Sequence, residues 1–196
     1  VVAVTRLSAE DLPRVVRSLE EAGITVLATE TPSSTLMRLE YPTANVDQRI
    51  LTVAATAGSF TVEQVRSVDA RACIISPSFR GEFPIEVIRE LRRRDAMISA
   101  DAQGFIRVRH ADGRLSHEAW PERDKVLRLL DILKADAVEA EALTGESDIR
   151  AAARTLAALG PREVVITHRN GILVHAGGEI FTAEFHVASL VGRSGR

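Results

Sequence analysis

The sequence of 196 residues has little cysteine, few aromatic side chains and no long apolar run. Its one cysteine, Cys73, excludes a disulfide within the chain and favours a reducing, cytoplasmic location. Cys73 lies in the apolar stretch ACIIS, so we interpret it as a small buried apolar residue. No apolar run approaches the ~20 residues that a membrane-spanning helix needs. We therefore expect no membrane partner.

The sequence also lacks an excess of one charge. Lys and Arg total 25 and Asp and Glu total 27, for a formal charge of -2. This balance gives no reason to expect nucleic acid or an anionic membrane as a partner. The five histidines have no metal-ligand spacing, and G-x-S-x-G, Walker A and G-x-G-x-x-G motifs are missing. These absences argue against hydrolase, P-loop and Rossmann functions.

The middle of the chain alternates strand-like and helix-like stretches, which predicts the α/β class. Apolar runs such as RACIISP and AMISADAQG are each followed or preceded by amphipathic stretches. Helices are predicted over 8–23 and 61–68, where Ser8 with Asp11 and Thr61 with Gln64 have capping-box spacing. Such alternation predicts a mostly parallel sheet covered by helices on both faces.

Two segments are predicted to be antiparallel. Three β-rich runs between residues 24 and 56 predict a small lid beside the sheet. Asp112-Gly113, at the centre of IRVRHADGRLSHEAW, is a hairpin signal. No linker divides the chain, so residues 1–196 are interpreted as one domain.

Asp136 and Glu139, in LKADAVEAEALTG, are candidate metal ligands. They follow a strand and begin a helix, which places both carboxylates at the carboxyl edge of the sheet, where open α/β sheets bind ligands. Carboxylates so placed can hold a hydrated Mg²⁺ that also binds substrate phosphates. The other interpretation is ordinary helix capping by an Asp at the N-cap and a Glu three residues later.

Two further stretches contain candidate binding residues. SADAQGFIRV offers Asp101 and Gln103 at the end of a strand and Arg107 shortly afterwards, or it is a polar strand exit with an exposed arginine. The final VGRSGR follows an apolar run and has the composition of a phosphate-binding loop, or it is a frayed tail. Its candidate residues are Gly192, Arg193, Ser194, Gly195 and Arg196.

These stretches, in this order, resemble the ribokinase-like (PfkB) family of carbohydrate and nucleoside kinases over nearly the whole chain. LKADAVEAEALTG is similar to the family's K-P-N-x-x-E stretch followed by L-T-G, with Ala135 for Pro and Asp136 for Asn. TLAALGPREVVITHRNG is similar to the strand near the nucleotide and retains Thr167, but lacks its first glycine and is one residue short in the turn. ADAQGFIR is similar to D-x-N-x-R, with Gln103 for Asn and Arg107 displaced.

The resemblance implies a three-layer α/β/α fold with a central mostly parallel sheet and a small β lid. It implies Mg²⁺ at Asp136 and Glu139, ATP near Thr167, and the small-molecule substrate near Gln103 and Arg107. VGRSGR resembles the start of D-T-x-G-A-G-D, which forms an anion hole. Gly195 and Arg196 would then belong to the catalytic loop, with Gly192, Arg193 and Ser194 near the cofactor.

The implied activity is transfer of a phosphoryl group from ATP to a hydroxyl of a sugar, cyclitol or nucleoside. DAQGFIRV is similar to the inositol-kinase-like branch. The family's catalytic Asp would lie just beyond Arg196, so we expect both ends of the domain to be missing and these 196 residues alone to be inactive. The lid strands would also be where a homodimer forms.

Two alternatives remain open from the sequence. A ligand-binding or sensor protein on a kinase scaffold is favoured by Asp136 in place of Asn and by the shortened turn after Thr167. An unrelated nucleotide-binding α/β domain would have no separate lid.

Overall fold

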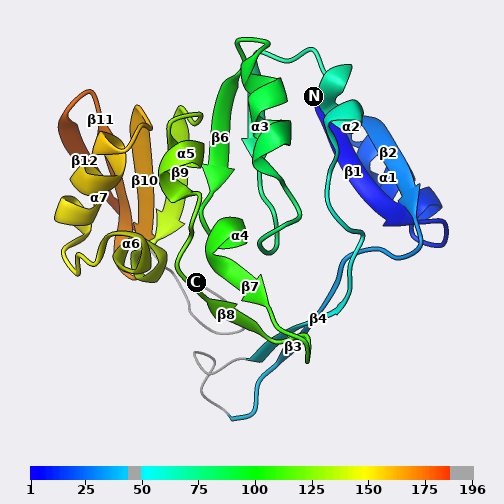
Figure 1. Cartoon of the computed structure of the whole chain (residues 1–196), viewed down its shortest axis with the longest axis horizontal. Helices are drawn as coiled ribbons and strands as arrows, with labels where there is room; N and C mark the ends of the chain where they lie inside the picture. Colours follow the sequence, from blue (N-terminus) through cyan, green and yellow to red (C-terminus); the bar gives the residue numbers. More distant parts are fainter. Residues whose placement is uncertain (44–49, 186–196) are drawn as a thin grey trace.

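The centre of the molecule is a six-stranded sheet of order β12-β11-β10-β9-β6-β5 (Figure 1). The computed structural model describes residues 1–43 and 50–185. Strands β10, β9, β6 and β5 run parallel, and β11 and β12 extend one edge in antiparallel pairing. Their bounds are β5 Ala72–Ile75, β6 Met97–Asp101, β9 Ile132–Asp136, β10 Glu163–His168, β11 Gly171–Ala176 and β12 Glu179–Glu184. The mostly parallel sheet predicted from the sequence is confirmed.

Helices pack against this sheet along its length. α6 and α7 contact each other and the β9–β11 part of the sheet, while α3 contacts β6 and is itself covered by α2. The helices after the first are α2 Val62–Arg66, α3 Ile85–Arg92, α4 Gln103–Ile106, α5 Arg123–Leu127, α6 Ala137–Thr144 and α7 Ile149–Ala158. Among residues 1–43 and 50–185, no helix has the length and apolar character to cross a bilayer.

A separate unit forms at the N-terminal side from β1 (Val2–Ser8), α1 (Leu12–Glu21) and β2 (Thr25–Thr31) (Figure 1). The Ser8 hydroxyl donates to the Asp11 carboxylate at 3.1 Å and accepts from the Asp11 backbone N–H at 3.3 Å. The predicted helix start at Ser8 is nevertheless wrong, because Ser8 is the last residue of β1 and α1 begins only after its N-cap residue Asp11, whose side chain makes no cap hydrogen bond. Gly23, at φ 75°, follows the helix and lets the chain turn back. β1 and β2 pair in parallel.

Two short antiparallel pairs lie apart from the central sheet. β3 (Leu36–Glu40) pairs with β4 (Ile50–Ala55), and β7 (Arg107–Arg109) pairs with β8 (Leu115–His117) around the predicted Asp112-Gly113 turn. The antiparallel arrangement predicted for residues 24–56 therefore holds for β3 and β4. It is wrong for β2, because α1 returns the chain alongside β1 and makes the pair parallel.

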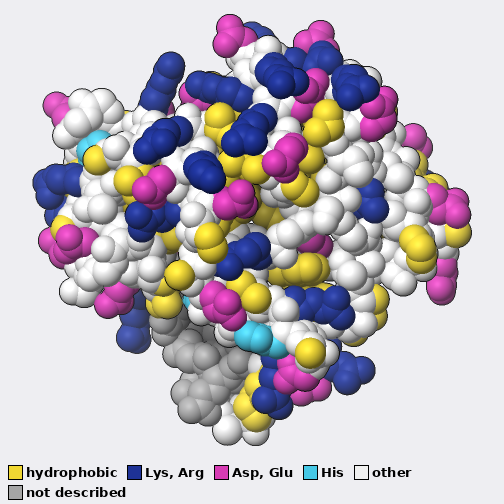
Figure 2. All heavy atoms as spheres, viewed as in Figure 1, with side chains coloured by type: hydrophobic (Ala, Val, Ile, Leu, Met, Phe, Trp, Pro, Cys, Tyr) yellow, Lys and Arg dark blue, Asp and Glu magenta, His cyan; other side chains and the backbone are white. Residues whose placement is uncertain are grey.

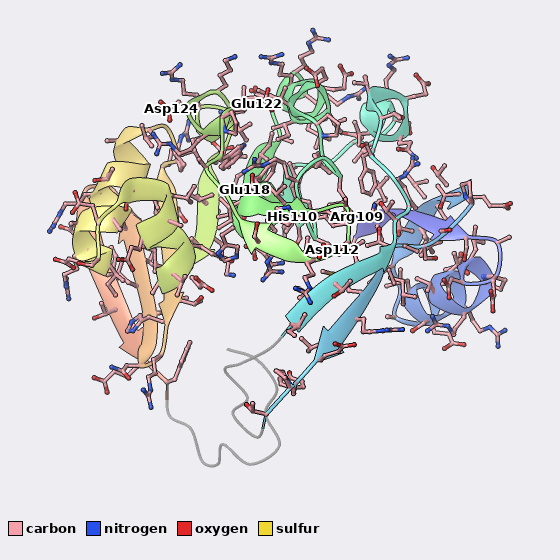
Figure 3. All side chains as sticks on the ribbon, turned by 60° about the horizontal axis from the view of Figure 1, so that its bottom comes forward. Arg109, His110, Asp112, Glu118, Glu122 and Asp124 are labelled. Atoms are coloured by element: carbon pink, nitrogen blue, oxygen red, sulfur yellow. The ribbon has the colours of Figure 1, made fainter. Side chains whose placement is uncertain are left out.

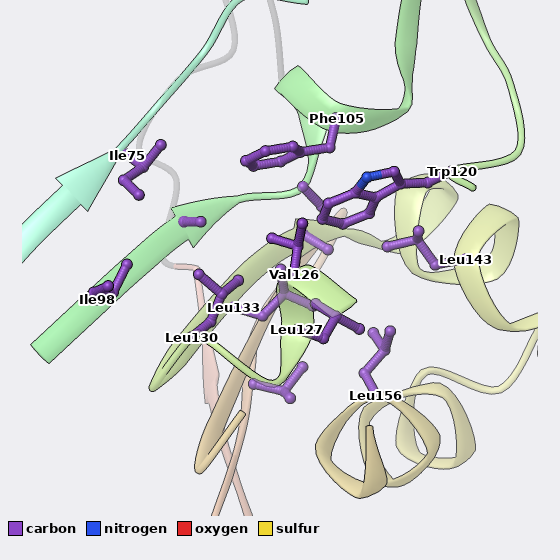
Figure 4. Close-up of a cluster of buried hydrophobic side chains, with 14 of the residues drawn as sticks. Ile75, Ile98, Phe105, Trp120, Val126, Leu127, Leu130, Leu133, Leu143 and Leu156 are labelled. Atoms are coloured by element: carbon purple, nitrogen blue, oxygen red, sulfur yellow. The ribbon is translucent and has the colours of Figure 1, made fainter. Parts of the chain in front are cut away.

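The hydrophobic core fills the space between the sheet and its helices (Figure 4). In β9 the side chains of Leu133 and Ala135 are fully buried, while those of Lys134 and Asp136 are only half-buried. Phe105 and Trp120 stack in this core with ring centroids 4.5 Å apart. Cys73 is half-buried and packs against the same core, close to its interpretation from sequence. Because β9 alternates in this way, its polar residues point away from the core.

Acidic and basic side chains are interspersed on the face seen in Figure 2, without a large area of one sign. This distribution agrees with the small net charge of the sequence.

Candidate functional site

Polar residues from three parallel strands meet at the carboxyl edge of the central sheet. Asp101, the last residue of β6, is opposite Lys134 of β9. Asp136, the last residue of β9, is opposite Thr167 of β10. Asp101 and Lys134 thus share one row of the sheet, and Asp136 and Thr167 share another row two residues further along, both at the edge where these parallel strands end. It is the edge at which open α/β sheets bind ligands.

Asp136 and Glu139 are joined by a reciprocal capping box at the start of α6. The Asp136 carboxylate accepts from the Glu139 backbone N–H at 2.8 Å, and the Glu139 carboxylate accepts from the Asp136 N–H at 2.8 Å. The predicted spacing is thus confirmed in its capping role. Glu139 is 1% exposed, an unusual burial for a carboxylate.

Burial raises the pKa of Glu139 above its usual value. The nearby Asp136 and Asp101 carboxylates also raise this pKa, whereas the hydrogen bond from the Asp136 N–H and the charge of Lys134 lower it. The site therefore holds crowded negative charge in a poorly solvated place. A cation bound beside it would relieve that repulsion.

The Asp136–Glu139 pair fits a hydrated Mg²⁺ but not a site made entirely of protein ligands. Among the described residues, no group of three or more His, Cys, Asp or Glu side chains is placed to hold a metal ion. One oxygen of each carboxylate serves the helix cap, and the second oxygen of each takes no part in the cap. Mg²⁺ commonly uses one or two carboxylates and completes its shell with water and substrate phosphates.

Lys134 supplies positive charge beside these carboxylates. Its Nζ lies 3.0 Å from Asp101 Oδ2, and the two side chains are 36% and 22% exposed. A half-exposed ammonium at a ligand-binding edge can pair with an incoming phosphate oxygen.

The β7–β8 hairpin brings Arg107 and His117 towards the same region. The two residues are directly opposite each other at the open end of the hairpin. Burial lowers the pKa of His117, the charge of Arg107 lowers it further, and the Asp136 carboxylate opposes both. Arg107 directly follows α4, and the backbone N–H of the first α4 residue, Gln103, donates to Asp101 Oδ1 at 3.1 Å, so this end of the hairpin begins near the sheet edge.

The structure brings together most of the described residues predicted for the site. Thr167, Asp136 and Glu139 lie at the sheet edge, and Gln103 is close by, because its backbone N–H donates to Asp101 Oδ1 at 3.1 Å. Arg107 joins from the hairpin. The predicted loop residues Gly192, Arg193, Ser194, Gly195 and Arg196 lie outside the described residues.

Sequence reasoning gave no site role to Lys134 or His117. A signal existed for both. Lys134 alternates with the apolar residues Leu133 and Ala135 in β9, so its side chain lies on the strand face that points away from the core. Counting outward from the Asp112-Gly113 turn pairs His117 with Arg107, which was already a candidate.

Comparison with known proteins gives structural relatives only. No family model matches the chain, and no curated protein matches it. A sulfate complex of a pyrophosphate-dependent kinase in the ribokinase family is 33% identical with a TM-score of 0.89, and the match covers 98% of this chain and 68% of that one. A second such structure, bound to a pyrophosphate analog and myo-inositol, is 32% identical with a TM-score of 0.88, covering 98% and 67%.

A more distant neighbour shares the fold alone. Ribokinase from Arabidopsis thaliana, complexed with ribose and ATP, is 17% identical with a TM-score of 0.67, and the match covers 97% of this chain and 62% of that one. The chain thus spans about two thirds of the length of these proteins. With 33% identity across nearly all of its residues and a mostly parallel α/β sheet, the chain belongs to the ribokinase (PfkB) family of kinases and has its three-layer α/β/α fold.

Proposed function

We propose that this protein transfers a phosphoryl group to a hydroxyl of a cyclitol, with myo-inositol as the first candidate, and that its donor is pyrophosphate. The observation that carries the proposal is the cluster of Lys134, Asp136 and Glu139 at the carboxyl edge of the sheet. The relatives at 32–33% identity are described as pyrophosphate-dependent, and one was solved with myo-inositol. ATP, the donor expected from the sequence, is the competing choice and is bound in a relative of 17% identity.

Lys134 would bind the donor. Its ammonium, now paired with Asp101, can exchange this partner for a phosphate oxygen because it is more than a third exposed. Phosphoryl transfer depends mainly on positioning and on compensating charge, and a fixed cation serves both. Thr167, beside Asp136 in the sheet, would add a hydroxyl near the same phosphates.

Asp136 and Glu139 would hold Mg²⁺ through the oxygens not used by the cap. When bound, this ion would neutralise charge on the donor phosphates. The chain's own contribution is to fix both carboxylates, since each is held by a backbone N–H and cannot rotate freely.

The acceptor would lie between the sheet edge and the β3–β4 pair, near Gln103 and Arg107. In this proposal β3 and β4 act as a lid that limits access of water, which would otherwise compete for the phosphoryl group. The loop containing Gly192, Arg193, Ser194, Gly195 and Arg196 would form the anion hole.

A direct test is a donor and acceptor panel with the full-length protein. Pyrophosphate and ATP would each be combined with myo-inositol, ribose and adenosine, and phosphorylated products identified by ³¹P NMR and mass spectrometry. Formation of an inositol phosphate from pyrophosphate supports the proposal. Transfer from ATP alone would reject the donor, and ligand binding without any product would favour a binding protein on a kinase scaffold.

The two lysines of the sequence provide a matched pair of variants for that test. Lys134→Met removes the site cation, whereas Lys125→Met removes an exposed one on α5. We expect Lys134→Met to lower kcat/KM for the donor by about 10²-fold, comparable to loss of one stabilising charge in an enzyme site. Equal activities of the two variants would exclude Lys134 from donor binding.

A further inference from the structure

Arg80, in the loop between β5 and α3, binds three main-chain carbonyls through one guanidinium. Its Nε donates to the Phe105 oxygen at 2.6 Å, and its Nη2 donates to the oxygens of Glu118 and Ala119 at 3.0 and 2.8 Å. Its backbone N–H donates to the Arg107 oxygen at 2.7 Å. Within residues 1–43 and 50–185 no carboxylate forms an ion pair with this arginine, and its side-chain hydrogen bonds serve the backbone of residues 105–119.

The acceptors lie on both sides of the β7–β8 hairpin. Phe105 comes just before β7, and Glu118 and Ala119 come just after β8. One side chain therefore fastens both strands where the hairpin leaves the body of the protein. The fork of Arg is suited to this, since it directs several N–H groups in one plane, whereas Lys presents a single compact ammonium.

The fastened end of the hairpin is also the end that reaches the candidate site. Arg107 is the first residue of β7 and His117 the last of β8, and they pair across the hairpin. Arg107 directly follows α4, whose first residue, Gln103, donates its backbone N–H to Asp101 Oδ1 at 3.1 Å at the sheet edge. A change at Arg80 would thus shift two site residues without removing either.

The opposite end of the hairpin is attached to β4. The Val53 N–H donates to the Gly113 oxygen at 2.8 Å, and Thr52 forms an isolated bridge with Arg114. Figure 3 shows Arg109, His110 and Asp112 where the hairpin meets β3 and β4, with Glu118 towards the other end. The hairpin is consequently held at its base by Arg80 and at its tip by β4.

We propose that Arg80 is a positioning residue of the phosphotransfer site, which sets the placement of Arg107 and His117 by clamping the base of the β7–β8 hairpin. This inference rests on the proposed function, because it takes the carboxyl edge of the sheet as the place where the phosphate donor binds. Misplacement of binding groups by even ~1 Å lowers activity strongly.

Trp120 offers a readout of the clamp that does not depend on activity. It is the only tryptophan of the chain, it follows the Ala119 carbonyl directly, and it stacks on Phe105 with an interplanar angle of 15°. Loosening of the clamp should change the emission of Trp120 and speed amide exchange in residues 105–119.

The test compares Arg80→Lys with Arg89→Lys in the full-length protein. Arg89, on α3, is 52% exposed and makes only a 3.8 Å ion pair with Glu86, so it is a matched surface control. We expect Arg80→Lys to alter Trp120 emission, to increase exchange in residues 105–119 and to weaken pyrophosphate binding by about 10-fold. Arg89→Lys should match the wild type in all three.

A double variant separates positioning from general stability. In a His117→Ala background, Arg80→Lys should change kcat/KM less than it does in the wild type, since part of its effect acts through His117. Altered emission and exchange with unchanged pyrophosphate affinity would overturn the proposal, as would unchanged emission and exchange or full additivity. If the wild type binds pyrophosphate but shows no turnover, the proposed function is rejected, and the role of Arg80 is then decided by the pyrophosphate affinities of the variants. If the wild type does not bind pyrophosphate, both the proposed function and this inference are overturned.

Discussion

Asp136 and Glu139 exchange hydrogen bonds between side chain and backbone, each at 2.8 Å. The same two carboxylates therefore begin α6 and supply the negative charge of the candidate site. Substitutions here affect stability and ligand binding together unless the replacement preserves the cap.

Glu139→Gln preserves an acceptor for the Asp136 N–H but removes the buried charge. Because burial raises the pKa of Glu139 in the folded protein, the folded state binds more protons than the unfolded state between the ordinary Glu pKa and the raised one. Wild-type stability contributed by this group consequently falls as pH rises through that range. We expect the variant to gain stability relative to wild type in urea titrations as pH rises above the ordinary Glu pKa, and to bind Mg²⁺ about 10- to 100-fold more weakly.

Asp136→Asn is the companion variant for this prediction. Asn also caps helices well, and it removes a carboxylate that raises the pKa of Glu139. The pH dependence of stability should therefore become shallower. A dependence unchanged in both variants would show that Glu139 does not titrate differently in the folded protein.

Asp131→Asn should destabilise the protein by about 1–3 kcal/mol at pH 7. The Asp131 side chain is 11% exposed, and its Oδ2 accepts from Arg92 Nη1 at 2.6 Å and from the Ile98 N–H at 2.9 Å. Arg162→Gln is the control, because Arg162 is 81% exposed and 3.8 Å from Asp131, and it should cost less than ~0.5 kcal/mol. Equal losses in urea unfolding would contradict the importance of the Arg92 contact.

The same aspartate predicts a loss of stability in acid. Burial alone would raise its pKa, but the Ile98 N–H and Arg92 outweigh burial and hold it below the usual value. Its contribution is present above the ordinary Asp pKa of ~3.9 and is lost as pH falls through the folded-state pKa. The difference in the free energy of unfolding between wild type and Asp131→Asn should therefore become smaller as urea titrations are repeated at more acidic pH.

Gly113→Ala should disturb the contact between the hairpin and β4. A Cβ at Gly113 would lie 2.8 Å from the Val53 oxygen, and its φ is 83°. Gly178→Ala is a matched control, with φ 84° and nothing within 4 Å of its Cβ. In both variants the left-handed conformation of Ala should lower the free energy of unfolding by about 1–2 kcal/mol. Gly113→Ala should lower it by a further ~1–3 kcal/mol or speed exchange of the Val53 amide. Equal stability and equal Val53 exchange in the two variants would mean that the backbone around Gly113 and Val53 adjusts to the new Cβ without loss of stability.

Cys73 should react slowly in the folded protein. Burial raises the pKa of its thiol, and the side chain packs against the core. Labelling with a thiol reagent at pH 8 should be at least several-fold slower than in the urea-unfolded chain. Equal rates in both states would indicate that the β5 region opens readily.

Local signals in the sequence predicted local structure well. Capping residues marked the starts of α2 and α6. The Ser8 and Asp11 pair was misleading in detail, because Ser8 belongs to β1 and α1 begins at Leu12. Asp112-Gly113 predicted the hairpin. Each of these signals acts through hydrogen bonds or dihedral angles within a few residues, so no tertiary contact is needed to read it.

Partners distant in sequence were harder to predict. The apolar alternation of residues 25–31 identifies a strand but does not say that its neighbour is β1. Likewise, nothing near Arg80 in the sequence indicates that its guanidinium binds carbonyls 25, 38 and 39 residues away. The family motif drew attention to Asp136 and Glu139, whereas the contribution of His117 follows from how the hairpin folds back.

The central strands lie across the sheet in the same order in which they occur along the chain, from β5 at one edge to β12 at the other. During synthesis, each new strand can therefore add to an edge that its predecessor has just completed, and none has to insert between two strands already paired. The β7–β8 hairpin, which comes between β6 and β9 along the chain, leaves this growing edge undisturbed because it pairs outside the sheet. Assembly of the scaffold can thus follow the ribosome strand by strand, a path that limits the time for which a long unpaired strand edge is exposed.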